Sequence, residues 1–76
     1  MEQMKMHTLR AGECGIMEQA SLSDAMQTRL RDIGLIPGTS VVCVGKSPLG
    51  DPAAYRIRGA VFALRKTDCA HIILRR

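Results

Sequence analysis

The chain is poor in aromatic residues, with one Tyr, one Phe and no Trp among its 76 residues. A core built from it is therefore aliphatic, and a site that binds by stacking rings on a ligand is not expected. The chain also lacks a C-x-x-C pair. Its three cysteines are an odd number, which indicates reduced thiols rather than a disulfide framework.

Long hydrophobic segments are missing as well. The longest apolar run covers residues 60–64, far short of the roughly 20 that a membrane span needs. Residues 1–7 lack the apolar stretch of a signal peptide. These observations predict a cytoplasmic protein without membrane insertion.

A catalytic constellation is absent too. The sequence has no Ser/His/Asp set, no carboxylate pair beside an obvious apolar pocket and no H-E-x-x-H motif. A chain of this length forms one small domain that buries only about 60% of its unfolded surface, which leaves little room for a substrate cleft. We therefore expect no enzyme and no catalytic residues.

What the chain does have is an uneven charge distribution. Its formal net charge is +4. Residues 53–76 hold six Lys and Arg against Asp68 alone, whereas residues 1–52 hold five against six acidic residues. A basic C-terminal third favours an acidic protein partner, an anionic membrane surface or nucleic acid, or it is a solvated face that keeps the protein soluble.

The hydrophobic patterning predicts a mainly β domain with one inserted α-helix at about residues 23–33. Within that range, and just before it, Leu22, Met26 and Leu30 recur at helical spacing, and Gly34 is suited to end the helix. Prolines and glycine predict a loop at residues 47–52. One helical turn is expected over residues 67–70, and short strands over residues 16–19, 40–46, 55–58, 61–65 and 71–74.

Five short strands with close turns indicate a small, partly open β-barrel whose interior is filled by side chains. Residues 1–7 are expected to be a flexible N-terminus and residues 8–76 to form the barrel. By alternation, Val42 and Val61 face outward, as scattered surface residues or as part of a contact patch. The residues expected to face the core are Ile16, Leu30, Ile33, Val41, Cys43, Tyr55, Ile57, Phe62, Leu64 and Ile73.

The stretch from Leu30 to Arg65 resembles the FeoA family, and with a weaker opening at Leu9, Gly12, Glu13 and Gly15 the match spans most of residues 8–76. Its R-L-x-D-x-G-L, I-P-G-T and A-P-L-G-D-P motifs stand here as R-L-R-D-I-G-L at 29–35, I-P-G-T at 36–39 and S-P-L-G-D-P at 47–52. Its paired strands stand as Y-R-I-R-G-A-V-F-A-L-R at 55–65. The resemblance implies an SH3-like barrel with a helix after the first strand. It also implies a small cytosolic accessory protein of ferrous iron uptake that acts on FeoB, a membrane transporter with a cytosolic GTPase domain.

The resemblance leads us to expect the cytosolic domain of a FeoB-type transporter as partner, docked on the helix edge, the loop or the basic strand face. Self-association through unpaired edge strands is a second expectation. No cofactor is expected, and direct Fe(II) binding stays open. The residues expected to contact the partner are Gln27, Arg29, Arg31, Leu49, Asp51, Arg56 and Arg58.

Two alternatives follow from the residues themselves. Cys69 and His71 are candidate metal ligands, but their spacing matches no zinc motif, and we predict no metal site. Arg56, Arg58 and Arg65 alternate onto outward positions, so a small basic barrel that binds nucleic acid or a different acidic protein is the alternative function. The scarcity of aromatic residues, and the expected core positions of Tyr55 and Phe62, count against nucleic acid.

Overall fold

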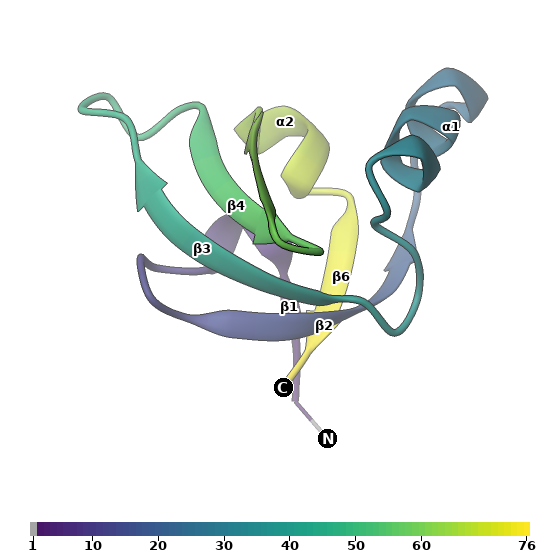
Figure 1. Ribbon diagram of the computed structural model, residues 1–76, viewed down its shortest axis with the longest axis horizontal. Coiled ribbons are helices and arrows are strands. Elements are labelled where there is room, and N and C mark those ends of the chain that lie inside the picture. Colours follow the sequence, from purple (N-terminus) through teal and green to yellow (C-terminus); the bar gives the residue numbers. More distant parts are fainter. Residues whose placement is uncertain (1) are drawn as a thin grey trace.

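The computed structural model describes residues 2–76 as one curled antiparallel sheet with short helices on its connections (Figure 1). The sheet order is β1-β6-β2-β3-β4-β5. The strands are β1 (Gln3–Lys5), β2 (Cys14–Ala20), β3 (Ser40–Lys46), β4 (Ala53–Ile57), β5 (Ala60–Leu64) and β6 (Ile72–Arg75). The helices are the 3₁₀ helix η1 (Met6–Thr8), α1 (Asp24–Asp32) and α2 (Lys66–Cys69). None of these helices is long and apolar enough to cross a membrane.

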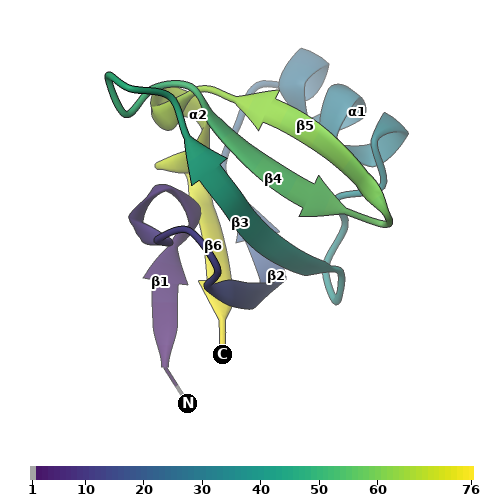
Figure 2. The same cartoon turned by 60° about the vertical axis from the view of Figure 1, so that its left-hand side comes forward.

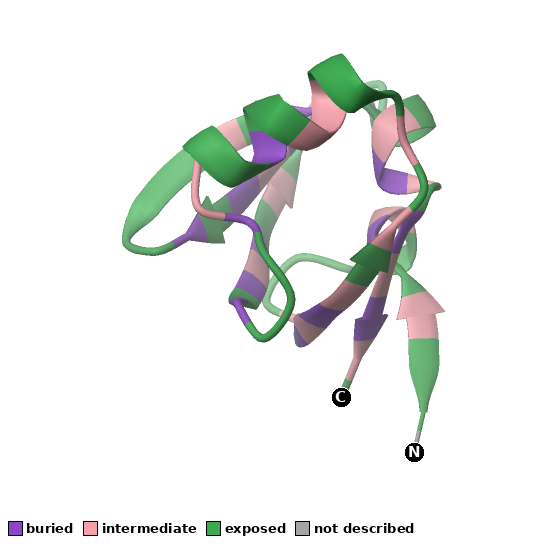
Figure 3. Cartoon of the chain, turned by 90° about the vertical axis from the view of Figure 1, so that its right-hand side faces the viewer, coloured by how far each residue is buried: buried purple, intermediate pink, exposed green. Residues whose placement is uncertain are grey.

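Helix α1 forms where the sequence predicts it. The Ser23 hydroxyl caps its start by accepting the Met26 N–H at 3.3 Å, and Asp24 lies in the first turn, where the helix dipole favours a negative charge. Leu30 is buried against the strands, while the other side of the helix is exposed (Figure 3). Gly34 follows the helix with φ at +89°, a conformation that glycine adopts at little cost.

The core confirms most of the predicted inward positions. Leu30, Val41, Cys43, Tyr55, Ile57 and Leu64 are buried. Ile33 and Phe62 are half-buried and pack against this core.

Two of the predicted core residues are wrong by one position. Ile16 and Ile73 are half-buried, and their neighbours Met17, Ile72 and Leu74 are buried instead. Both strands hold apolar residues at consecutive positions, so alternation alone does not fix the register. The inward position before Met17 is Gly15, where a Cβ atom would lie 3.1 Å from Leu74. The core therefore requires a glycine where alternation alone predicts a hydrophobic residue.

The N-terminal segment differs from the expectation of flexibility. Residues 3–5 form β1, which pairs with β6 so that Gln3 lies opposite Arg75, and Met6 and Leu9 are fully buried. The barrel thus has six strands rather than five. A strand of three residues is too short to show alternation, and its pairing depends on the free edge of β6. Met1 lies outside the described residues.

Candidate partner-binding surface

The outer face of the sheet, turned away from the core, carries the predicted strand contact Arg56. The pairing register places Cys14, Val42, Arg56 and Val61 side by side across β2, β3, β4 and β5. Arg56 is exposed between Tyr55 and Ile57, which are buried. Val61 is 54% exposed, as alternation predicts, whereas Val42 is half-buried.

Apart from Arg56, the outer positions of β3, β4 and β5 are uncharged. Ala54 lies opposite Ala63, and Val44 is 39% exposed beside the register shift of β3. On β3, β4 and β5 this outer face is therefore an apolar surface with one cation, Arg56, within it. Alternation along β5 places Ala63 outward, as the structure confirms, and alternation along β3 would have identified Val44 as a surface residue, but sequence reasoning did not single Val44 out.

Arg58 occupies the tip of the hairpin that joins β4 and β5. Its φ is 51°, and that of Gly59 is 81°, as a two-residue hairpin turn with two left-handed residues requires. A left-handed arginine is strained relative to glycine or asparagine. Its Nε donates a hydrogen bond of 3.1 Å to the Gly34 carbonyl oxygen, and a Cβ atom on Gly34 would lie 2.5 Å from the Arg58 Cδ. Arg58 therefore ties the hairpin to the end of α1.

The predicted contacts on α1 divide into two kinds. Arg29 and Arg31 are exposed in its last turn, where a positive charge complements the helix dipole. Gln27 is half-buried, and its side-chain amide donates a 2.7 Å hydrogen bond to the Ala20 carbonyl oxygen. Gln27 thus holds the helix to the end of β2, and the two arginines are the side chains available to a partner.

The loop of residues 47–52 shows the same division. Leu49 is 94% exposed at its tip. Asp51 accepts the Lys66 backbone N–H at 2.8 Å and so stabilises the start of α2. Of the two predicted contacts in this loop, Leu49 is therefore the one whose side chain is free to contact another molecule.

A cavity of about 350 Å³ opens between this loop, η1 and α2. Burial lowers the pKa of His7 on its wall, and the positive charges of Lys66, Lys5 and Lys46 lower it further. The residues that line the cavity are His7, Lys46, Leu49, Gly50, Asp51, Ala53, Tyr55 and Lys66. Cations, an anion and apolar groups share this wall, and among residues 2–76 no three His, Cys, Asp or Glu side chains are placed to hold a metal ion.

The candidate metal ligands Cys69 and His71 have different environments. Cys69 is fully buried, and burial raises the pKa of its thiol to about 11, against a smaller lowering by its hydrogen bond with Tyr55. At neutral pH this sulfur is a protonated thiol, whereas a metal ligand is a thiolate. His71 is exposed. One of the two candidate ligands is therefore in the core and the other at the surface.

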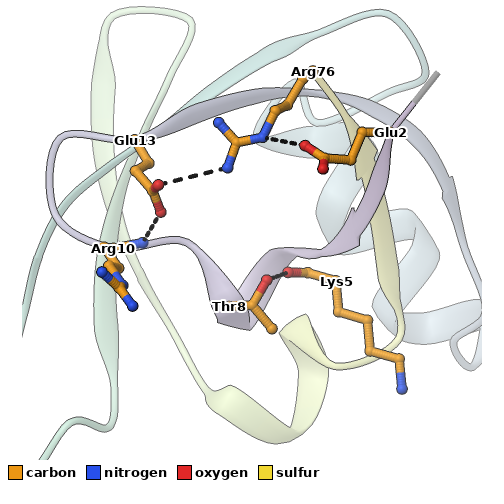
Figure 4. A network of polar contacts seen from close by, with 6 residues as sticks. All are labelled: Glu2, Lys5, Thr8, Arg10, Glu13 and Arg76. Carbon is orange, nitrogen blue, oxygen red and sulfur yellow. Dashed lines mark hydrogen bonds and ion pairs between the residues drawn. The ribbon is translucent and has the colours of Figure 1, made fainter.

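One cation of the basic C-terminal third is already paired. Arg76 forms ion pairs with Glu2 at 2.8 Å and with Glu13 at 3.5 Å (Figure 4). The hydrogen bond from the Arg10 backbone N–H lowers the pKa of the Glu13 carboxyl, and the hydrogen bond and positive charge of Arg76 lower it further. Within residues 2–76 these are the ion pairs present, so Arg56, Arg58, Arg29 and Arg31 keep their charges available.

Comparison with known proteins agrees with this architecture. The FeoA domain family profile matches residues 4–76. A fusion of an Fe(2+) transport protein A with an Fe(2+) transporter FeoB, from Porphyromonas gingivalis, is 28% identical over 69 residues, which are 91% of this chain. The chain corresponds to only 8% of that protein's length.

Two solved structures show the same fold. The FeoA protein of Chlorobium tepidum superposes with a TM-score of 0.90 at 28% identity, covering 95% of this chain and 69% of that one. The FeoA of Stenotrophomonas maltophilia, an SH3 domain protein determined in complex with zinc, gives a TM-score of 0.80 at 27% identity, covering 93% and 88%. The profile match spans nearly the whole described chain, and the chain belongs to the FeoA family.

Proposed function

We propose that this domain is a non-enzymatic, cytoplasmic accessory of ferrous iron uptake. It docks on the cytosolic portion of a FeoB-type transporter and biases the transporter's GTPase or gating equilibrium. The observation that carries the proposal is the fusion protein, in which a similar domain and a FeoB transporter share one chain. A domain that acts on a tethered partner needs a recognition surface rather than a catalytic site.

The proposed surface joins the outer face to the nearby arginines. Arg56, Arg58, Arg29 and Arg31 are exposed cations without an acidic partner within residues 2–76, and Leu49 offers an exposed apolar side chain. Such a surface fits an acidic protein region. To regulate the transporter, the domain must bind two of its states with different affinity, because equal binding would leave the equilibrium unchanged.

The test is an amide NMR titration of the labelled chain with the cognate FeoB cytosolic domain, once with GDP and once with a non-hydrolysable GTP analogue. We expect nucleotide-dependent shifts on the outer face and at Arg58. Arg56→Glu with Arg58→Glu should weaken binding by about tenfold or more, because two attractive charges become repulsive. Arg56→Glu alone separates this effect from the role of Arg58 in the turn.

The matched control is Lys5→Glu with Arg10→Glu, which changes the net charge by the same amount in β1 and in the turn before β2. If both double variants weaken binding equally, only net charge matters and the surface is wrong. If the wild-type chain shows no shifts in either nucleotide state, docking to that domain is ruled out.

Nucleic acid remains the alternative ligand class. Both aromatic residues of the chain belong to the core side, since Tyr55 is buried and Phe62 packs half-buried against the core. A stacking platform beside the arginines is therefore lacking. Retention on a nucleic-acid column that falls steeply with salt would favour this alternative, because phosphate contacts release counterions.

A further inference from the structure

Strand β5 is the last strand of the sheet, and within residues 2–76 no other strand pairs with its free side (Figure 2). Its five residues carry no charge and no proline, and four of them remain exposed or half-buried. Exposed edges of this kind are templates for pairing with another chain, and proteins normally protect them with charges, prolines or bulges. This edge has none of these within the strand.

The hairpin register shows which backbone groups are free. Ile57 and Ala60 flank the two-residue turn and form a hydrogen-bonded pair, and the two pair types alternate from there. Ala60, Phe62 and Leu64 therefore bond to β4. The N–H and C=O groups of Val61 and Ala63 point away from the sheet, where an added strand would meet them.

Charge decides which kind of strand fits. Arg58 lies at one end of β5, Arg65 and Lys66 lie at the other, and Arg56 is exposed on the neighbouring strand. Two acidic residues lie near this end: Asp51 accepts the Lys66 backbone N–H, and Asp68 follows Lys66 in α2. Neither forms an ion pair with Arg65 or Lys66 within residues 2–76. A strand added to β5 would therefore have a cation near each of its ends. A third cation, Arg56, would lie near its outer face.

A second copy of this chain is a poor match for the same reason. Antiparallel pairing of two β5 strands about Phe62 brings the Arg58 turn of each copy towards the Arg65 and Lys66 end of the other. The like charges brought together at both ends of the pair oppose this association. An acidic segment instead places its negative charges next to the cations at both ends of β5, where they attract each other.

We propose that β5 is a binding site for an extended acidic segment of a partner protein, which adds as a further strand next to Val61 and Ala63. Apolar residues of the segment cover the half-buried Phe62, and its acidic residues, on the outer side, reach Arg56 over Val61. Strand addition of this kind draws affinity from backbone hydrogen bonds and specificity from alternate side chains. The inference deepens the proposed function by naming the mode of contact, and it is tested without the transporter.

The probe is an acetylated and amidated nine-residue peptide in which glutamate alternates with valine, titrated into the labelled full chain. Amide shifts should concentrate on β5, and the Val61 and Ala63 amides should gain protection from hydrogen exchange. The control peptide carries lysine in place of glutamate and should bind at least about tenfold more weakly, because it meets like charges at both ends of β5.

Three variants make the test specific. Ala63→Pro removes an outward N–H without removing a bond to β4, and should abolish binding. Val61→Glu should weaken binding of the acidic peptide by about tenfold, whereas Val61→Lys, a similar replacement of opposite charge, should not weaken it. Unchanged amide shifts in β2 and β6 check that each variant keeps the fold.

Several outcomes overturn the proposal: neither peptide binds, both bind alike, or Val61→Glu and Val61→Lys lose binding equally. A dimer of the chain alone that Ala63→Pro dissociates also overturns it in favour of self-association. Repeating the titration with the FeoB cytosolic domain separates the two levels. If that domain binds Ala63→Pro as well as wild type, strand addition fails while the proposed function stands. If the peptide binds but the domain does not, the proposed function fails while strand addition stands.

Discussion

Strand β1 ends the sheet with three residues, of which Gln3 and Lys5 are exposed and polar, whereas β5 ends it with five residues that carry no charge. The Gln3 side chain donates to the Glu18 carboxylate, and Glu2 beside it pairs with Arg76. On the β5 side, Arg58 at the turn donates a hydrogen bond to the Gly34 carbonyl oxygen, and Asp51 accepts the Lys66 backbone N–H just beyond the other end of the strand.

The difference shows that one sheet can protect one edge and leave the other available. Short length and charge are common devices against unwanted strand pairing, and β1 has both. The cations around β5 lie beyond its ends and not within it, so they select the charge of an added strand without blocking its approach. Substitutions near β1 and near β5 measure how much each end of the sheet contributes to the stability of the fold.

Met6→Ala should destabilise the fold most. The side chain is fully buried directly after β1, and truncating a buried methionine typically costs about 2–5 kcal/mol. Denaturant unfolding measures the change. Met6→Leu, which keeps the volume, should cost less than about 1.5 kcal/mol, and Val61→Ala on the exposed edge should stay within about 0.5 kcal/mol. A negligible loss for Met6→Ala would show that the β1 end does not hold the core.

Gly34→Ala should cost about 1–2 kcal/mol, because its φ of +89° is unfavourable for a residue with a Cβ atom. That atom would also displace the Arg58 side chain from its place over Gly34. The same unfolding experiment measures the loss, and amide shifts at the β4–β5 turn report the displacement. Gly38→Ala is the matched control, because its φ is +94° and nothing lies within 4 Å of the added Cβ. Equal losses in both would mean that the Arg58 contact contributes nothing.

Arg76→Ala should loosen the β1 end by about 0.2–1 kcal/mol, the usual range for exposed ion pairs. The effect should shrink at high salt, and faster amide exchange in β1 should accompany it. Arg75→Ala, next to it in the chain, serves as the comparison, because Arg75 forms no ion pair within the described part of the chain. Loss of stability that is independent of salt would argue against an electrostatic tie.

The smallest effect concerns pH. Burial and the nearby lysines lower the pKa of His7 below its ordinary value of 6.5, so the unfolded chain binds a proton more readily than the folded one. Stability should therefore rise with pH between the folded pKa and 6.5, and be lost as the pH falls through that window. Unfolding at pH 7.5 and 5.0 measures it. His7→Gln should flatten the difference between the two values, and an unchanged slope would contradict the assignment to His7.

Much of the fold could be predicted because its signals are local. The cap at Ser23, the spacing of Leu22, Met26 and Leu30, and the alternation around Tyr55 each act within one element. Strand β1 could not be found in this way, since its three residues become a strand only by pairing with β6. The inward positions of β2 and β6 were predicted wrongly for a similar reason, because the glycine at the inward position 15 is required by Leu74 across the sheet.

The candidate surface was predictable only in part. Alternation placed Arg56 and Val61 outward, which the structure confirms. It did not reveal that Gln27 and Asp51 bond to the backbone of Ala20 and Lys66. Backbone groups are present at every residue, so a sequence gives no sign of which one a polar side chain will meet.

The pairing of β1 with β6 has a consequence for how the chain can be rewired. Gln3 lies opposite Arg75, and Glu2 forms an ion pair with Arg76, so these two segments lie side by side (Figure 4). A linker of a few glycine and serine residues could join them, and new ends could be opened in the exposed loop around Leu49, since circular permutation succeeds at such sites. The permuted domain would carry its attachment points beside the cavity instead of beside the Gln3–Arg75 pair, so cargo could be tethered from a different direction.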